Sequence, residues 1–476
     1  MVGGLLAIGL LPCVAQQLHP CMPPAHLAPP PPSRPELAKQ PSKFLLLERE
    51  AEQEYRPQIL AALQGKVEAL AESLRRSPPD CVQCQRPMVR HDTRPVWWQA
   101  RCGRLRTRVT RYRCGVCGAE RRPLLEQLGV EPGRICGALA RLLALLAVVA
   151  PYPLAARLAY LLLGVEVSAM GVWRATQRLG EAALDYSEAL SAYHNDSRSP
   201  AAATIEPAPA AVVLAIDGCS LGMQVRKQRR RRRSAQDILP PLPTVEEGQF
   251  REVKTAVLLL PEERTESSPG RHALVRRCLV SCLGNADAIY AQVWAQLCQL
   301  GWLGAQTVVV IVGDGAEWIW KRASMFPHCC EILDFWHAVE HAWQFARLQY
   351  GENSQRAAHW VHQIASDLRL GQVGAVIARL QRMRPTTPEA RQELQALLRY
   401  YRENAARMRY DEYLRLGYGI GSGAVESAHK QLVHARMRQA GMRWSEAGAR
   451  RLLALRLLLL NDDWARMDRL RMVAIA

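Results

Sequence analysis

The stretches VVLAIDGCS (212–220) and VVVIVGDGAEWIW (308–320) decide the fold class of this chain. Each begins with an apolar run rich in β-branched residues and then reaches Asp-Gly, a pattern typical of a buried strand followed by a tight exit. Asp217 and Asp314 would therefore emerge at the carboxyl ends of two strands. Adjacent strands of one sheet would bring the two carboxylates together. Asp-Gly is a common turn, so the inference depends on both stretches.

A third stretch, GIGSGAVESAHKQ (419–431), is a Gly-rich turn that enters a helix carrying Glu426. Two strand-end aspartates and a helix glutamate can hold a pair of Mg²⁺ or Mn²⁺ ions. Such ions activate a water or a 3′-hydroxyl and stabilise the leaving oxygen in phosphoryl transfer. Lys430, one turn after Glu426, would neutralise a nearby phosphate. The alternative is a solvated helix face with an ordinary Glu–Lys pair.

Charge and composition indicate the partner and the compartment. The chain has 476 residues, with 62 Lys and Arg against 44 Asp and Glu, for a net charge of +18. This balance favours a polyanionic partner, here double-stranded DNA, through counterion release. No stretch approaches the roughly 20 apolar residues of a membrane span, so we expect no membrane partner. Most of the 14 cysteines lie in apolar runs or CxxC pairs, which favours a reducing cytoplasm.

Two CxxC pairs predict a metal site in residues 81–125. Cys81 and Cys84 form one pair, and Cys114 and Cys117 form the other. Two such pairs complete a tetrahedral sulfur site for Zn²⁺. The segment WWQARCGRLRTRVTRYRC between them is rich in arginine and aromatic residues, and it suits a β-hairpin that lies on phosphates. A purely structural zinc, or reduced cysteines without a DNA role, is the alternative.

Residues 130–195 read as three helices separated by turns. Ser168 can cap the third helix, from which Arg174 and Arg178 would reach into a DNA major groove in the manner of a helix-turn-helix. An ordinary three-helix packing unit explains the same pattern equally well.

The rest of the chain predicts an α/β protein of several parts. A disordered, Pro-rich segment (1–42) and a helical segment (43–80) precede the cysteine module. An α/β core would follow in two parts, 211–340 and 418–465, and the pattern of residues 341–417 between them is helical. The strands and the helix expected in its first part are 211–217, 251–260, 274–282, helix 286–300, 306–313 and 329–334.

The chain resembles bacterial insertion-sequence transposases of the DDE class, in the branch related to Mutator-like elements. The segments IVGDGAEWIW, ILDFWHAVEHAW and GSGAVESAHKQLVHARMRQAGMRWSEAGARRLLALR carry the resemblance, which covers roughly residues 80–460. It implies an RNase H-like mixed sheet interrupted by a helical insertion, with Asp217, Asp314 and Glu426 as the catalytic residues. A D-x-x-H element falls on Asp334 and His337. From the residues alone, that pair could orient a phosphate or the metal shell, or His337 could be structural.

The function that the resemblance implies is transposition: Mg²⁺-dependent cleavage and strand transfer at element ends, by a homo-oligomer on DNA. We expect Arg436, Arg438 and the run Arg229, Arg230, Arg231, Arg232 and Arg233 to contribute DNA contacts, although the run could be a solvated loop. Two alternatives remain at this point. One is an RNase H-like nuclease that cuts without joining, and the other is a non-enzymatic, zinc-dependent DNA-binding regulator.

Overall fold

We analysed a computed structural model of the full chain. It divides the chain into two compact units, residues 1–58 and 59–476. The segment predicted to be disordered and the run Arg229–Arg233 lie outside the described residues, apart from residue 42. The structure describes residues 42–130, 135–197, 208–224, 249–268, 271–274 and 276–468.

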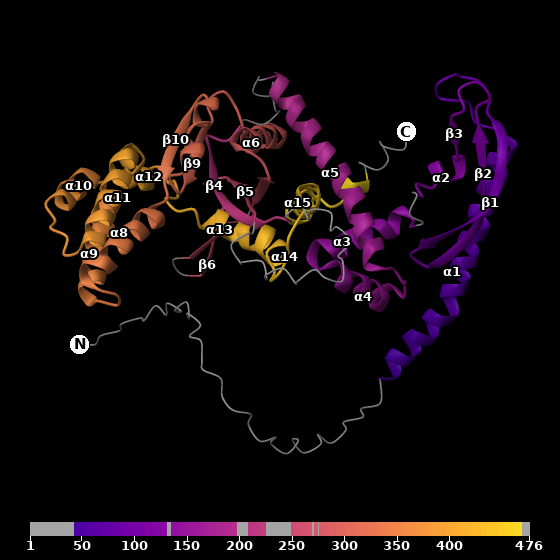
Figure 1. The fold of residues 1–476 in the computed structure, drawn as a ribbon, viewed down its shortest axis with the longest axis horizontal. Helices are drawn as coiled ribbons and strands as arrows, with labels where there is room; N and C mark the ends of the chain where they lie inside the picture. The colour runs from indigo at the N-terminus through magenta and orange to yellow at the C-terminus, as the bar shows by residue number, and fades with distance from the viewer. Residues whose placement is uncertain are drawn as a thin grey trace, which may run out of the picture. The chain divides into compact units, whose positions relative to one another are not determined.

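A mixed five-stranded sheet forms the centre of the α/β region, in the order β10-β9-β4-β5-β8 (Figure 1). The strands β10, β9 and β4 run parallel to one another, whereas β5 is antiparallel to both β4 and β8. The predicted strands are therefore present, with shifted ends. Their bounds are β4 Ala211–Gly222, β5 Phe250–Leu259, β8 Arg277–Cys282, β9 Val308–Gly313 and β10 Cys329–Leu333.

Alternation along β4 supplies both faces of this sheet with apolar side chains. Val213 and Ala215 face one core, which includes residues of helices α8 (Phe335–Tyr350) and α13 (Gly423–His429). Leu214 and Ile216 face a second core, together with helix α6 (Ala286–Leu300). Since Asp217 continues the first set, it lies on the face that α8 and α13 cover.

Residues 335–415 are helical, as predicted, and pack around their own part of the first core. Their bounds after α8 are α9 Gln355–Arg369, α10 Val373–Gln381, α11 Pro388–Asn404 and α12 Tyr410–Arg415. Aliphatic residues such as Ile364, Leu380 and Leu397 are fully or almost fully buried between these helices. The tyrosines Tyr401 and Tyr410 fill the side nearest the sheet, where Tyr401 donates a hydrogen bond to the carbonyl of Ala338 in α8 (2.8 Å).

The three helices predicted in residues 130–195 are present as α3 (Gly137–Val149), α4 (Tyr152–Leu163) and α5 (Ala169–Ser197). The hydroxyl of Ser168 accepts a hydrogen bond from the N–H of Gly171 (3.1 Å). Helix α5 packs against the last helix, α15 (Glu446–Leu460). The contact is close at Gly180, where a Cβ would lie 2.7 Å from the carbonyl oxygen of Arg451. These helices thus pack on the C-terminal part of the chain.

The prediction that Arg436 binds DNA is not supported, because its side chain is 1 % exposed. Its Nε donates to the carbonyl of Ala147 in α3 (2.8 Å), and the guanidinium lies over the rings of Tyr152 and Trp444. The residue therefore joins α3 to the C-terminal helices. It does not face solvent where a phosphate could approach.

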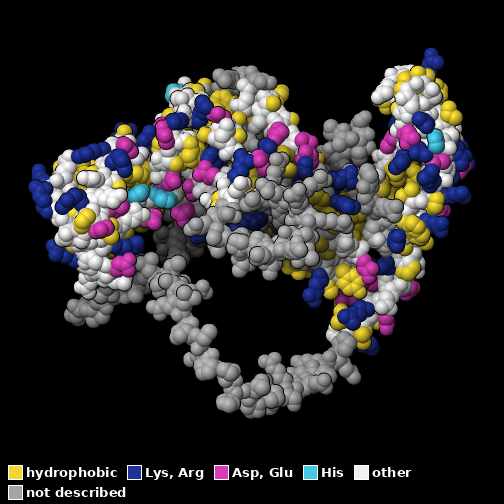
Figure 2. Space-filling model, in the orientation of Figure 1, with side chains coloured by type: hydrophobic (Ala, Val, Ile, Leu, Met, Phe, Trp, Pro, Cys, Tyr) yellow, Lys and Arg dark blue, Asp and Glu magenta, His cyan; other side chains and the backbone are white. Residues whose placement is uncertain are grey.

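The cysteine module consists of a β-hairpin with a short third strand and a small helix. The long helix α1 (Lys43–Arg76) precedes it, and Val67 and Ala71 of α1 pack in its apolar interior with Leu105 and Val109. Arginine side chains, dark blue in Figure 2, recur along the hairpin. The bounds are β1 Val89–Ala100, β2 Gly103–Arg113, β3 Glu120–Arg121 and α2 Pro123–Gln127. In the part of the chain that the structure describes, no helix is long and apolar enough to cross a membrane.

Candidate functional site

The four predicted cysteine ligands meet in one cluster. The sulfur atoms of Cys81, Cys84, Cys114 and Cys117 all lie within 4.8 Å of one another. Each CxxC pair sits on a tight turn of the same form. The carbonyl of Cys81 accepts the N–H of Gln85 (2.8 Å), and that of Cys114 accepts the N–H of Gly118 (3.1 Å). Gln85 and Gly118 both adopt positive φ, at 53° and 73°.

This cluster could bind a metal ion such as zinc. Sulfurs that are 2.3 Å from a tetrahedral Zn²⁺ would be about 3.8 Å apart, and Cys81 Sγ lies 3.5 Å from Cys117 Sγ. The backbone N–H groups of Cys117 and Val116 lower the pKa of the Cys114 thiol to about 6. The neighbouring thiol of Cys117, with burial, raises the pKa of Cys84 to about 12. Four sulfurs at these distances cannot all ionise without a cation between them, and a divalent metal would supply that charge.

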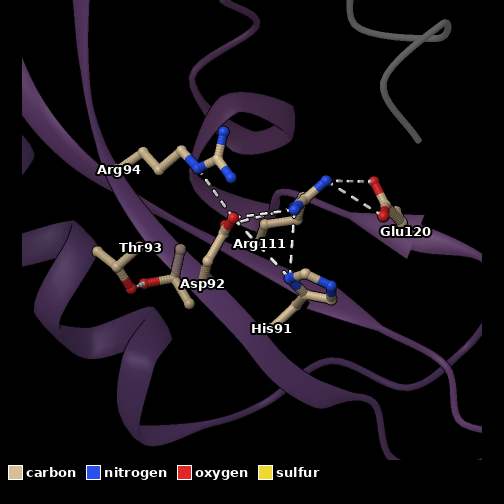
Figure 3. A network of polar contacts seen from close by, with 7 residues as sticks. His91, Asp92, Thr93, Arg94, Arg111 and Glu120 are labelled. Carbon is tan, nitrogen blue, oxygen red and sulfur yellow. Dashed lines mark hydrogen bonds and ion pairs between the residues drawn. The ribbon is translucent and has the colours of Figure 1, made fainter.

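Carboxylates pair with two arginines, Arg94 and Arg111, at the end of the hairpin near the cysteines (Figure 3). Arg111 contacts Asp92 at 2.9 Å and Glu120 at 3.1 Å. Asp92 also accepts from Arg94 (2.9 Å). This network lowers the pKa of Asp92, chiefly through the hydrogen bonds from Arg111. These arginines stabilise the module and are not free for phosphate.

The other end of the hairpin has arginines on its exposed face that lack carboxylate partners among the described residues. Arg104, Arg106 and Arg108 alternate along β2 with the buried Leu105, Thr107 and Val109. The guanidinium carbons of Arg104 and Arg106 lie 4.8 Å and 5.3 Å from the ring centre of Trp97 in β1. This face matches the predicted pattern of arginine and aromatic residues, and its charge is available to a polyanion.

The register of the central sheet brings the two predicted aspartates side by side. Ala215 of β4 pairs with Val312 of the parallel strand β9, and two residues further along each strand come Asp217 and Asp314. Asp217 Oδ1 accepts from the N–H of Gly218 (2.6 Å), and Asp314 Oδ1 accepts from the N–H of Ala316 (2.9 Å). Their second oxygens are not held by these turns. The two carboxylates therefore lie side by side where β9 ends. Asp217 does not end its own strand as predicted, because β4 continues to Gly222 and stays paired with β5, with Asp217 opposite Thr255.

Burial, with the charge of Asp314, raises the pKa of Asp217 to about 6, although the Gly218 N–H acts in the opposite direction. Neighbouring carboxylates disfavour each other's ionisation, and a cation placed between them would relieve that repulsion. The positive group already nearby is His337. Its contact with Asp334, and the charges of Asp314 and Asp217, raise its pKa to about 9.

Asp334 and His337 are joined at the end of the next strand, β10. The buried carboxylate of Asp334 caps α8 by accepting the N–H of Trp336 (2.7 Å) and lies 3.2 Å from Nδ1 of His337. It also accepts the N–H of Ser422 (2.8 Å) and the Ser422 hydroxyl. Burial would raise the pKa of Asp334, but the bonds from His337 and Ser422 lower it below its usual value. Asp334 thus fixes the Gly-rich turn that leads to Glu426.

Helix α13 packs against β4 and β5 and carries the third predicted carboxylate. Its buried residue His429 places Nδ1 3.6 Å from Oδ2 of Asp217. Burial, with the charges of His434 and Arg438, lowers the pKa of His429 to about 4, so its imidazole is neutral at pH 7. Glu426 and Lys430 are exposed on the same helix.

The structure does not draw Asp217, Asp314 and Glu426 into one compact group. Among the described residues, the four cysteines alone form a set of three or more metal-binding side chains with all ligand atoms within 4.8 Å. The two aspartates lie side by side on the sheet, and Glu426 belongs to the helix that packs on β4 and β5.

The remaining predicted DNA contacts differ in exposure. Arg174, Arg178 and Arg438 are exposed, and Arg438 contacts His434 through Nη1 and Nε2 (2.9 Å). Arg436 is buried, as described above.

Sequence reasoning missed three residues of this site. His429 follows Glu426 by three residues, so helical spacing could have identified it. Ser422 lies in the quoted turn, but nothing in the sequence links it to Asp334. Tyr400 donates to the backbone carbonyl of Asp314 (2.7 Å) from the distant helix α11, and Gly315, at φ +100°, leaves the room that this ring needs. No local signal points to that contact.

No protein-family model matches the chain, and no curated protein matches it. A functional conclusion must therefore be argued from the chemistry of the sites themselves.

Proposed function

We propose that this protein is a DDE transposase of an insertion sequence, which cleaves DNA at element ends and joins the freed ends to a target. Asp217, Asp314 and Glu426 would bind two Mg²⁺ or Mn²⁺ ions. The ions would supply Lewis acidity and an activated oxygen nucleophile. Lys430 would lie near a DNA phosphate, while Asp334 and His337 would position the turn before Glu426.

The placement of Asp217 beside Asp314 carries this proposal. These side chains come from neighbouring parallel strands in register, and both belong to the face that α13 covers. A mixed sheet with acidic residues at these positions, and a helical insertion before the last acidic helix, supports an RNase H-like core. The same arrangement also fits a nuclease without joining activity, so the reaction products must decide between the two.

The cysteine cluster supports a DNA-binding role for the N-terminal module. We propose that it is a zinc ribbon whose bound Zn²⁺ fixes the hairpin, so that Arg104, Arg106 and Arg108 face the phosphates of duplex DNA. The exposed residues Arg174 and Arg178 of α5 would contribute further contacts, and the protein would act as a homo-oligomer on DNA in the bacterial cytoplasm.

The test is a strand-transfer assay with Mg²⁺ and linear DNA that carries the sequences flanking the coding region. We expect the wild type to produce joined strands. Asp217→Asn, Asp314→Asn and Glu426→Gln should each abolish cleavage while retaining DNA binding. Glu317→Gln removes a carboxylate at the start of α7 (Glu317–Trp320) that is 81 % exposed and, among the described residues, pairs with Lys321 alone, so it should keep activity.

The outcomes separate the alternatives. Nicks without joined products would favour the nuclease, and DNA binding that needs no Mg²⁺ and leads to no cleavage would favour the regulator. Near-normal cleavage by any of the three carboxamide variants would remove that residue from the active site.

A further inference from the structure

Helix α4 presents apolar side chains to solvent along its outer face. Leu154, Tyr160, Leu161 and Leu162 are 47 %, 54 %, 64 % and 67 % exposed, and Met170 at the start of α5 is 54 % exposed. We call these five residues the α4 patch. Single exposed leucines are normal on a protein surface, but four exposed apolar residues on one 12-residue helix, with a fifth at the start of the next, favour a partner.

A hollow of about 480 Å³ adjoins this patch between α4 and the start of α5. Tyr160 forms part of its wall, with Arg157 and Glu166 at its rim. Within the described residues, neither Arg157 nor Glu166 has an ion-pair partner, and both are exposed. They are the only charged residues from 152 to 170. The surface therefore combines apolar area, a concavity and one unpaired charge of each sign.

This combination identifies the occupant. Nucleic acid needs clustered cations, and between residues 152 and 170 a single arginine is offset by a glutamate. A second copy of this chain has a net charge of +18, so two copies repel each other over most of their surfaces. They can approach where a patch is nearly neutral. In a two-fold contact each residue meets its counterpart reciprocally, and Arg157 of each copy can then pair with Glu166 of the other.

We propose that the α4 patch is the contact of a two-fold homodimer, with the leucines as anchors and the reciprocal Arg157–Glu166 pairs setting the orientation. This assigns a surface to the oligomer expected on DNA. The dimer is measured without DNA, so a failure of the transposase proposal would leave the result for this surface unaffected.

The first experiment is analytical ultracentrifugation of the full chain over a range of concentrations. The wild type should show a monomer–dimer equilibrium. The double variant Leu161→Glu/Leu162→Glu should weaken dimerisation by about a hundredfold, because buried anchors dominate the energy of a contact. Leu370→Glu changes a leucine that is 61 % exposed outside the patch, and it should leave the equilibrium unchanged. All three positions are exposed, so thermal unfolding should match the wild type.

The second experiment uses the charges. Arg157→Glu and Glu166→Arg should each weaken the homodimer by about tenfold, since each creates two like-charge contacts across the axis. Mixing these two variants should restore dimers, because every contact then joins opposite charges, and the double variant should dimerise alone. A monomeric wild type, or a Leu161→Glu/Leu162→Glu variant that dimerises normally, would overturn the proposal. Failure of the mixed variants to restore the dimer would overturn the reciprocal pairing.

Discussion

Replacing Arg456 with methionine should destabilise the protein by about 3 kcal/mol, because three buried carbonyl groups would lose their donors. Arg456 lies in α15 and is 5 % exposed. Its Nε donates to the carbonyl of Leu432 (2.5 Å), and its two terminal nitrogens donate to the carbonyls of Gln431 and Val148. Gln431 and Leu432 belong to a π-helical turn, Lys430–His434. Val148 lies in the last turn of α3, where carbonyls lack partners within the helix.

The size of this effect follows from two opposing contributions. Each unpaired buried carbonyl costs about 1 to 3 kcal/mol, so three give about 3 to 9 kcal/mol. Methionine fills similar space and avoids the cost of burying a guanidinium, which amounts to several kcal/mol. Burial, with the charge of Arg436, lowers the pKa of Arg456 to about 10, so the arginine is still charged at pH 7. The loss of three partners outweighs the relief of one buried charge.

Urea unfolding, followed by far-UV circular dichroism, measures this difference in the free energy of unfolding. The comparison assumes that both proteins have the same m-value, the slope of that free energy against urea concentration. The stability of Arg456→Lys should lie between those of the wild type and Arg456→Met, because an ammonium cannot direct donors to three carbonyls as a planar guanidinium does. Arg415→Met removes an arginine that is 73 % exposed and ion-paired at the surface, and it should stay within about 0.5 kcal/mol of the wild type. If Arg456→Met unfolds at the same urea concentration as Arg415→Met, the carbonyls have other partners and the reasoning is wrong.

Three further predictions concern other parts of the molecule. Freshly purified protein should contain about one Zn²⁺ per chain by elemental analysis, and Cys81→Ser or Cys114→Ser should lose the metal together with DNA binding. A metal-free wild type would refute the zinc site. Gly180→Ala should destabilise the protein by about 1 to 3 kcal/mol in urea unfolding, because a Cβ would lie 2.7 Å from the backbone of Arg451; unchanged stability would show that α5 and α15 can separate. Contact with Asp334 raises the pKa of His337 from 6.5 to about 9. The contribution of this pair to the stability of the fold is therefore fully present below pH 6.5 and is lost as the pH rises through 9. Asp334→Asn should therefore lose about 1 to 2 kcal/mol at pH 6, after discounting for the partial exposure of His337. The deficit should shrink toward pH 9 in urea unfolding, and a pH-independent deficit would contradict the pairing.

Local patterns predicted most of the α/β core because burial on both faces leaves a clear signal. The run before Asp217 and the run before Asp314 are continuously apolar, as strands covered on both sides must be. Strand pairing places Ala215 beside Val312 and so brings the two aspartates side by side. The prediction that both end their strands was right for Asp314 only, since β4 continues past Asp217 to Gly222. The two CxxC pairs were equally informative, because a metal-binding turn requires fixed local spacing. Strand ends shifted by a few residues, since pairing partners decide where a ladder stops.

Residues brought in from distant parts of the chain left no such signal. Asp334 was assigned to a D-x-x-H element, but its bonds to Ser422 depend on how α8 meets the Gly-rich turn. Tyr400 reaches the backbone of Asp314 from the helical insertion. Both contacts depend on packing between segments more than 80 residues apart, which no local spacing encodes.

Arg436 is buried although it was predicted to contact DNA, and the cause is the geometry of its helix. On a regular α-helix each residue advances by roughly 100°, so Arg436 would lie roughly 80° from Glu426 and could share its exposed side. The π-helical turn Lys430–His434 accommodates one extra residue, which moves every later position back by roughly 100°. Arg436 then lies nearly opposite Glu426 and is buried, whereas Arg438 comes to within roughly 20° of it and is exposed. Arg456 donates to the carbonyls of Gln431 and Leu432 in this turn, so its side chain stabilises the turn that separates the directions of the two arginines.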